Sequence, residues 1–215
     1  MKFNITPMFS VPLFQTNLGQ LNIITKTWLM NLEFPNTAVG HDNTDDHLDP
    51  THRGMTILDK PQLKTLKKQI KESLDFFVHQ VLNIDDAVEF SITTSWVNRQ
   101  RKDEFISKHG HANSMLSGVY YIETNSNTAP ILFEKPYLYT NLVHETVQPS
   151  LKQIPRNQFN ASVYTIRPVP GDLLIFPSWL EHTVPDQSSV DRFSLAFNCF
   201  AKGNIGETSN MKVNL

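Results

Sequence analysis

The feature that most constrains the fold is a change of hydrophobic period near residue 86. Between residues 61 and 82, apolar residues recur every three or four positions, as in one long amphipathic helix. Asp59 precedes this run as the expected N-cap, and lysines occupy the opposite face. Residues 91–98 are instead β-branched and partly alternating, which predicts a strand. The chain therefore changes from a helical first part to a β-rich second part.

The second part contains several more expected strands, separated by turns. They are predicted at residues 116–123, 129–134, 162–167, 172–176 and 192–200. Short strands at this spacing are typical of a sandwich or jelly roll. Upstream, residues 8–16 predict an edge strand interrupted by Pro12, and residues 23–32 show a weak helical pattern.

The length of 215 residues favours one domain over residues 1–215. We expect an N-terminal part at 1–88 with the edge strand, helices and a polar loop, a barrel core at 89–202, and a tail at 203–215. Long polar connections are expected at 34–53 and 137–155. The first contains His41, His47 and His52, which are expected to be exposed loop residues or part of a lid.

Composition excludes several classes of function. Apolar residues make up 40% of the chain and the net charge is −2, which is typical of a soluble globular protein with no clear nucleic-acid signal. Cys199 is the one cysteine, so an intrachain disulfide is impossible. The sequence has neither a recognisable signal peptide nor a membrane span, so we expect a cytoplasmic protein, and a homodimer is left open.

Two histidines stand one residue apart at the mouth of an expected strand. If residues 109–111 are extended, His109 and His111 point to the same side. Imidazole is a common ligand of divalent transition metals, so the pair defines two corners of a candidate metal site, which His182 joins only through folding. An isolated H-x-H pattern, however, more often has a structural or surface role.

The last strand has one apolar face and one polar face. Phe193, Leu195, Phe197 and Cys199 form the apolar face, which is expected to pack against helices. Arg192, Ser194, Ala196 and Asn198 form the other face. A buried arginine requires a carboxylate or a phosphate, which Arg192 can hold with two parallel hydrogen bonds while Ser194 adds a hydroxyl. The alternative is an internal ion pair between Arg192 and an acidic residue.

Several motifs in order resemble one group of enzymes. They are H-G-H at 109–111, S-G-V-Y-Y at 117–121, F-P-S-W-L-E-H at 176–182 and R-F-S-L-A-F-N at 192–198. With these motifs the chain resembles small Fe(II)- and 2-oxoglutarate-dependent oxygenases of bacteria and their viruses. The resemblance is most specific over residues 95–200.

The resemblance implies a double-stranded β-helix, a cupin-like jelly roll with the N-terminal helices packed on its outside. It implies Fe(II) as the metal, with His109, His111 and His182 as ligands. It implies 2-oxoglutarate as co-substrate and O2 as oxidant. By the same resemblance, Arg192 holds the far carboxylate of 2-oxoglutarate, with Ser194 and Tyr121 beside it.

The chain departs from the superfamily at one ligand. The usual pattern is a histidine followed two residues later by an acid, but that position holds His111. If His111 is instead the first ligand, the acid position holds Asn113. Asp103, Glu104 and Glu181 lie near the ligands in sequence and are candidates for a completing carboxylate.

The expected function is therefore a dioxygenase, and a hydroxylase in its usual form. One alternative is a non-catalytic cupin-like module that binds a metal or a small acid, and another is a zinc-dependent hydrolase. The substrate is not identified by the sequence, since a small molecule and a protein side chain both fit. Asn98 is the candidate substrate contact.

Overall fold

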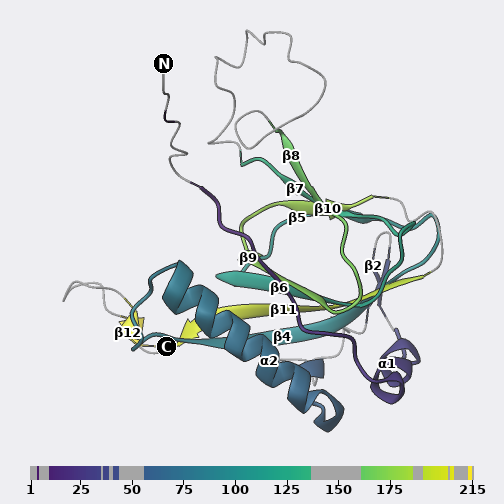
Figure 1. Cartoon of the computed structure of the whole chain (residues 1–215), viewed down its shortest axis with the longest axis horizontal. Helices are drawn as coiled ribbons and strands as arrows, with labels where there is room; N and C mark the ends of the chain where they lie inside the picture. The colour runs from purple at the N-terminus through teal and green to yellow at the C-terminus, as the bar shows by residue number, and fades with distance from the viewer. Residues whose placement is uncertain are drawn as a thin grey trace, which may run out of the picture.

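The computed structural model describes residues 4, 10–34, 36–38, 41–43, 56–136, 161–185, 191–202, 204–205 and 213–214. Two antiparallel sheets face each other, and helix α2 covers the outer face of the larger one (Figure 1). This arrangement confirms the expected double-stranded β-helix with helices outside. None of the helices in the described part of the chain is long and apolar enough to cross a membrane.

The larger sheet has seven strands and forms the platform of the molecule. In spatial order they are β1 Phe14–Asn17, β9 Asp172–Pro177, β6 Leu116–Glu123, β11 Arg192–Lys202, β4 Glu89–Gln100, β3 His41–Asn43 and β2 Asn36–Ala38. The smaller sheet has the order β5 Ile106–His109, β10 His182–Val184, β7 Ile131–Glu134 and β8 Val163–Ile166. Near the C-terminus, β12 Asn204–Ile205 pairs with β13 Val213–Asn214.

Most of the expected strands are present, some with different ends. The strand predicted at 116–123 is correct at both ends, and the one at 91–98 is longer in the structure. Part of the expected polar loop at 34–53 is instead the β2–β3 hairpin, which extends the sheet beyond β4. His41 lies on β3, whereas His47, His52 and the connection at 137–155 lie in segments that are not described.

The long helical segment is confirmed but is not one regular helix. It consists of a 3-10 turn, Pro61–Leu63, then α2 Lys64–Asp75 and then a π-helical stretch, Phe76–Val81. Its apolar stripe is buried through Val78, but Val81 is 49% exposed. The wider π turn, in which Leu82 N–H donates to Phe77 O, rotates the stripe out of phase and so exposes Val81.

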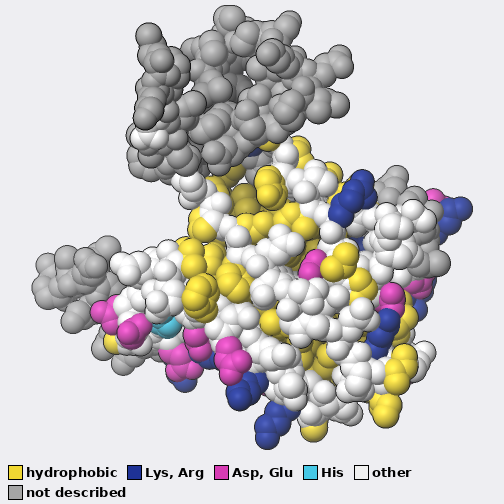
Figure 2. Space-filling view, viewed as in Figure 1, with side chains coloured by type: hydrophobic (Ala, Val, Ile, Leu, Met, Phe, Trp, Pro, Cys, Tyr) yellow, Lys and Arg dark blue, Asp and Glu magenta, His cyan; other side chains and the backbone are white. Residues whose placement is uncertain are grey.

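Asp59 does not cap this helix as predicted. It ends a separate 3-10 turn, Ile57–Asp59, and its carboxylate contacts Thr56 and Lys67 instead. Further along α2, Lys68 pairs with Glu72 and Lys71 pairs with Asp75. Charged side chains of both signs therefore gather over α2 on the solvent side (Figure 2).

Helix α1, Ile23–Met30, is capped by Asn22, whose side chain accepts from Thr25 N–H.

Strand β11 divides two hydrophobic cores, as its sequence pattern predicts. Its apolar face, Phe193, Leu195, Phe197 and Cys199, packs in the core that includes Leu66, Ile70 and Leu74 of α2. A second core fills the space between the sheets and includes Tyr121 of β6, Phe133 of β7 and Phe176 of β9. The polar face of β11 lies on this inner side, because strand residues alternate between faces.

Gly118 is required by close packing against β11. It pairs directly with Phe197, and a Cβ atom on Gly118 would lie 2.2 Å from Phe197 Cζ. The glycine of the S-G-V-Y-Y motif therefore makes room for an aromatic ring in the core.

Replacing Gly118 with alanine is expected to lower the free energy of unfolding by about 1–3 kcal/mol, the usual effect of overpacking a core. Chemical unfolding of the metal-free protein measures the effect. The double variant Gly118→Ala/Phe197→Leu should lose less stability than the two single changes added together, because the smaller side chain relieves the clash. Strictly additive losses would show that the two side chains do not compete for space.

Candidate active site

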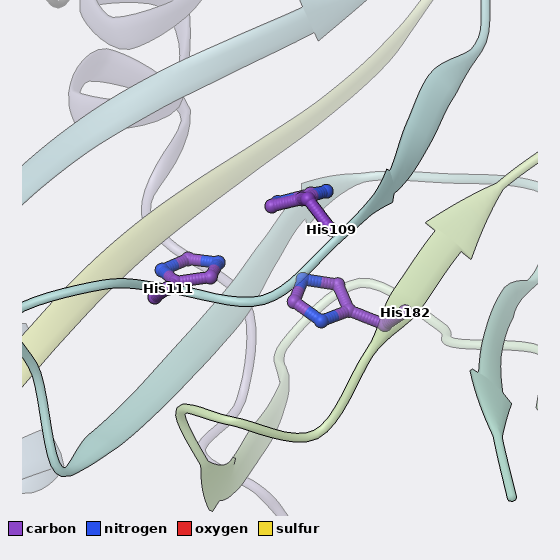
Figure 3. Close-up of side chains that lie close together, drawn as sticks. All are labelled: His109, His111 and His182. Carbon is purple, nitrogen blue, oxygen red and sulfur yellow. The ribbon is translucent and has the colours of Figure 1, made fainter. Parts of the chain in front are cut away.

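Three histidines from different parts of the chain converge between the sheets. His109 lies at the end of β5, His111 in the following loop and His182 at the start of β10 (Figure 3). One nitrogen atom from each ring can be chosen so that all three lie within 4.8 Å of one another. No carboxylate or thiolate joins this group among the residues that the structure describes. The structure therefore brings together all three histidines of the predicted metal site.

Strand pairing and one close backbone contact hold this arrangement. His182 pairs with His109 on one side and with Phe133 on the other. The extended conformation taken from the sequence as a condition for residues 109–111 is not a strand over its full length. Strand β5 ends at His109, and in the following loop His111 N–H donates to Ser178 O at 2.8 Å. A side chain at Gly110 would place Cβ 3.2 Å from Ser178 O, so glycine permits this close approach.

Hydrogen bonds assign the proton on each imidazole. Nδ1 of His109 lies 2.7 Å from Ser107 O, and Nδ1 of His182 lies 3.0 Å from Leu180 O. Nδ1 of His111 lies 2.6 Å from Oδ1 of Asn198. Because an oxygen of this kind only accepts, each Nδ1 carries the proton and each Nε2 keeps a free lone pair. This is the usual arrangement of histidines that bind a metal.

His111 supplies the clearest sign that the site fits a metal ion. Its Nε2 atom is buried and has no hydrogen-bond partner. An unsatisfied buried nitrogen costs free energy, which a bound divalent cation would offset. The donor set of three imidazoles suits iron, zinc, copper or nickel.

Burial keeps two of these imidazoles neutral. Burial lowers the pKa of His182 to about 3, with a further contribution from nearby His109. Burial likewise lowers the pKa of His111 to about 4, although the Asn198 hydrogen bond opposes the shift. Both rings therefore present neutral nitrogen ligands at physiological pH.

The metal-free protein is expected to lose stability as the pH falls below about 6.5, the pKa of an unfolded histidine. Between that pH and about 4 for His111, or about 3 for His182, the unfolded state binds more protons than the folded state. Stability from these groups is therefore complete above pH 6.5 and is lost toward the lower values.

Urea unfolding with a chelator, at several pH values between 7 and 4, measures this loss. Each unit of pKa displacement corresponds to about 1.4 kcal/mol. Comparison with His182→Gln removes the background from carboxylates, and the variant should show a shallower dependence. Equal slopes for the two proteins would contradict the assignment to His182.

Arg192 is a buried cation on the inner side of the larger sheet. Its side chain is 2% exposed, and its Nε and Nη1 atoms are buried with no hydrogen-bond partner. No described carboxylate pairs with it, so the internal ion pair considered from the sequence is not found among the described residues. Burial lowers the pKa of Arg192 from its usual value. A buried guanidinium with two unsatisfied nitrogens is suited to an anionic ligand.

Two other predicted cofactor residues lie next to Arg192. Its Cζ atom lies 5.0 Å from the ring centroid of Tyr121, whose hydroxyl is also buried without a partner. Ser194, 1% exposed, pairs with Tyr121 on one side and Asn98 on the other. Asn98 is buried and accepts a 3.0 Å hydrogen bond from Trp96 Nε1. The structure thus brings the four predicted residues together on adjacent strands.

The residues that the sequence offered to complete the metal site lie outside the histidine group. Glu104 accepts from the backbone of Arg101 at 2.6 Å, and Glu181 lies 3.6 Å from Lys108 Nζ. Asp103 is exposed in the turn after β4 and has a φ of 66°. Asn113 has a φ of 54° in the loop after His111. None of these residues belongs to the histidine group.

Sequence reasoning missed the residues that surround His111. Trp96 stacks on the imidazole with a centroid distance of 6.0 Å, and Asn198 accepts from Nδ1. Ser117 and Ser178 extend this contact as a line of hydroxyls. One signal was available: Asn198 shares the polar face of the last strand with Arg192, which indicates an inward position.

The fold is a double-stranded β-helix, and the histidine group inside it could hold a metal ion. Residues 94–198 match the sequence profile of the family described as "Putative 2OG-Fe(II) oxygenase". This segment is therefore similar to that enzyme family, in which 2OG stands for 2-oxoglutarate. The matched segment contains all three histidines, Arg192, Ser194 and Tyr121.

Solved structures with the same fold have little sequence identity to this chain. HygX from Streptomyces hygroscopicus, with nickel, 2-oxoglutarate and hygromycin B bound, is 12% identical, with a TM-score of 0.55 over 88% of this chain and 82% of HygX. A Pseudomonas putida prolyl-4-hydroxylase is 14% identical, with a TM-score of 0.52 over 88% and 93%. A 2OG-Fe(II) oxygenase family oxidoreductase from Burkholderia pseudomallei is 15% identical, with a TM-score of 0.51 over 80% and 74%. No curated protein matches the sequence.

Proposed function

We propose that this protein is an Fe(II)- and 2-oxoglutarate-dependent dioxygenase that hydroxylates its substrate. The observation that carries the proposal is Arg192, a buried cation with two unpaired nitrogens on the inner side of the barrel that holds the histidines. In the overall reaction, 2-oxoglutarate, O2 and a substrate C–H group give succinate, CO2 and a C–OH group.

The chain's own residues supply binding and positioning. His109, His111 and His182 hold the metal through Nε2, because each Nδ1 proton is engaged. Arg192 binds the far carboxylate of 2-oxoglutarate, and the hydroxyls of Tyr121 and Ser194 lie on the neighbouring positions to assist. Bound Fe(II) supplies the activation of O2 and the oxidative decarboxylation of the 2-oxo acid.

Three neutral ligands distinguish this site from one with two histidines and a carboxylate. Because no described residue of the group carries negative charge, the metal would keep its full double charge until a co-substrate binds. A dianionic 2-oxo acid would then compensate that charge directly. We infer that 2-oxoglutarate contributes more to metal retention here than it would beside a carboxylate ligand.

The substrate class remains broad within this proposal. One structural neighbour is a prolyl-4-hydroxylase and another is a protein with hygromycin B bound. The shared fold is thus compatible with a protein side chain and with a small molecule. Asn98 and Trp96 are the proposed substrate contacts, because they lie on the inner side of β4 beside Ser194 and His111.

The decisive experiment is an anaerobic titration of the Fe(II)-loaded protein with 2-oxoglutarate. Chelation of the metal by the 2-oxo acid should produce a visible metal-to-ligand charge-transfer band, and admission of air should then release succinate. If the protein binds Fe(II) but gives neither band nor succinate, it does not use 2-oxoglutarate.

A zinc-dependent hydrolase is the second candidate, favoured by the group of three histidines without a carboxylate. In that case Arg192 would bind an anionic substrate. The zinc-loaded protein would then hydrolyse an anionic ester with no need for oxygen, whereas the iron-loaded protein would release no succinate.

A further inference from the structure

His111 differs from the other two histidines in what fixes its proton. His109 and His182 donate to backbone carbonyls, which can only accept. His111 instead faces the side-chain amide of Asn198, 2.6 Å away. An amide has an accepting oxygen on one side and a donating NH2 group on the other, so its orientation decides the state of His111.

The two orientations have opposite consequences for metal binding. With the oxygen toward His111, the ring proton stays on Nδ1 and the Nε2 lone pair is free. With the NH2 group toward His111, Nδ1 must accept, the proton moves to Nε2 and the ring cannot bind a metal through that atom. Because Nε2 is buried with no partner, it makes no hydrogen bond that favours either form. Selection of the metal-binding form therefore depends on Asn198.

The hydroxyl of Ser117, at one end of a line of serine hydroxyls, determines the orientation of Asn198. Ser117 on β6 pairs with Asn198 on β11, and its Oγ lies 2.8 Å from Oδ1 of Asn198. Ser117 Oγ lies 2.8 Å from Ser178 Oγ, which lies 2.8 Å from Ser114 Oγ. The hydroxyl of Ser117 has one proton, and its donation to Oδ1 requires the amide oxygen to face Ser117. If Ser117 donated to Ser178 instead, the NH2 group of Asn198 would have to face Ser117.

Backbone contacts hold the ends of this hydroxyl line in place. Ser178 N–H donates to Met115 O at 3.0 Å, and Ser178 O accepts from His111 N–H at 2.8 Å. Ser114 Oγ lies 2.9 Å from Leu116 O and 3.1 Å from Cys199 O. Three separate motifs of the sequence, at 109–111, 117–121 and 176–182, therefore meet the last residue of the fourth motif.

We propose that Asn198, oriented by Ser117, is the positioning residue that makes His111 a metal ligand. The proposal rests on the proposed function, because it concerns the same metal. Asn198 does not touch the metal or the co-substrate in this account and acts only through the His111 ring.

Two near-isosteric variants test the proposal. Asn198→Leu removes the acceptor, whereas Asn198→Asp keeps an acceptor and has no NH2 group. In metal-free 15N-labelled protein, long-range 1H–15N correlation spectra report which His111 nitrogen carries the proton. Wild type and Asn198→Asp should carry it on Nδ1, and Asn198→Leu and Ser117→Ala should show a substantial population with the proton on Nε2.

Metal affinity gives the second readout. Anaerobic titration with Co(II) should show weakening of about 10–100-fold for Asn198→Leu, the usual loss for an outer-shell partner, and near wild-type affinity for Asn198→Asp. Asn31→Leu, at the end of α1, is the control, because the Asn31 amide donates to Thr27 O on the outer helix. Thermal unfolding checks that each variant is folded.

An unchanged His111 tautomer in both Asn198→Leu and Ser117→Ala would overturn the proposal, whatever the metal affinity. If Asn198→Leu does not fold, Ser117→Ala alone carries the same test. Failure of the wild-type protein to bind a metal would instead contradict the proposed function. The spectra of the metal-free protein separate these two failures.

Discussion

Replacement of Arg192 by alanine is expected to weaken 2-oxoglutarate binding by at least about 30-fold, while metal affinity stays within a few-fold of wild type. Truncating one partner of a buried charge pair costs about 2–5 kcal/mol, and about 1.4 kcal/mol corresponds to tenfold in affinity. Arg192 is 2% exposed and two of its guanidinium nitrogens have no partner, so a bound carboxylate would be its main counter-charge. Anaerobic calorimetry measures both dissociation constants. Mn(II) is titrated into the metal-free protein, and 2-oxoglutarate is titrated into the Mn(II)-loaded protein.

One further variant separates charge from geometry at position 192, and a second variant is a control. Arg192→Lys keeps the charge but loses the planar fork, and should therefore retain an intermediate affinity. Arg101→Ala is the control, because Arg101 is 47% exposed on the turn after β4 and contacts Glu104. Undiminished 2-oxoglutarate affinity in Arg192→Ala would remove Arg192 from its proposed role and would favour a site without an anion anchor.

The alternation along β11 explains why the sequence predicts so much of this molecule. The strand has eleven residues, Arg192–Lys202, and up to Cys199 it presents one apolar and one polar face. The structure places those faces against α2 and toward the smaller sheet. A strand of this length carries enough pattern to reveal which side is buried. The same reasoning worked for β6, whose predicted ends are correct.

Short elements explain most of what the sequence could not predict. β10 has three residues, His182–Val184, and β5 has four, Ile106–His109. Such segments contain too few positions for a period of two to be recognised. They form because neighbouring strands supply hydrogen-bond partners, which is a tertiary effect. The π turn at Phe76–Val81 likewise leaves no mark in the apolar spacing.

The candidate site likewise contains some residues that the sequence could identify and others that it could not. Its histidines and Arg192 were found because their chemistry is distinctive and their motifs resemble a known family. The contact between His111 and Asn198 joins residues 87 positions apart, and the contact between Ser117 and Ser178 joins residues 61 apart. Serine and asparagine are common residues, so only the strand pairing of β6 with β11 and β9 reveals that they meet.

Replacement of His182 by alanine is expected to abolish the charge-transfer band and to lower metal affinity by more than the roughly 10–100-fold that loss of an outer-shell partner costs. His182 is 6% exposed and lies between His109 and Phe133 in the smaller sheet. A side chain from the protein surface therefore cannot take its place as a ligand. Two imidazoles would remain, with no described carboxylate in the group. Anaerobic absorption spectra with Fe(II) and 2-oxoglutarate give the measurement.

Two controls make this result specific to the metal site. Glu181→Ala changes the adjacent residue, whose carboxylate faces Lys108, and should leave the band intact. His79→Ala removes a histidine on the outer helical layer, where Nδ1 contacts Ile84 O, and should also leave it intact. A band that survives in His182→Ala would mean that His109 and His111 suffice for chelation. Loss of the band in Glu181→Ala would instead show that this carboxylate moves into the coordination sphere when the metal binds.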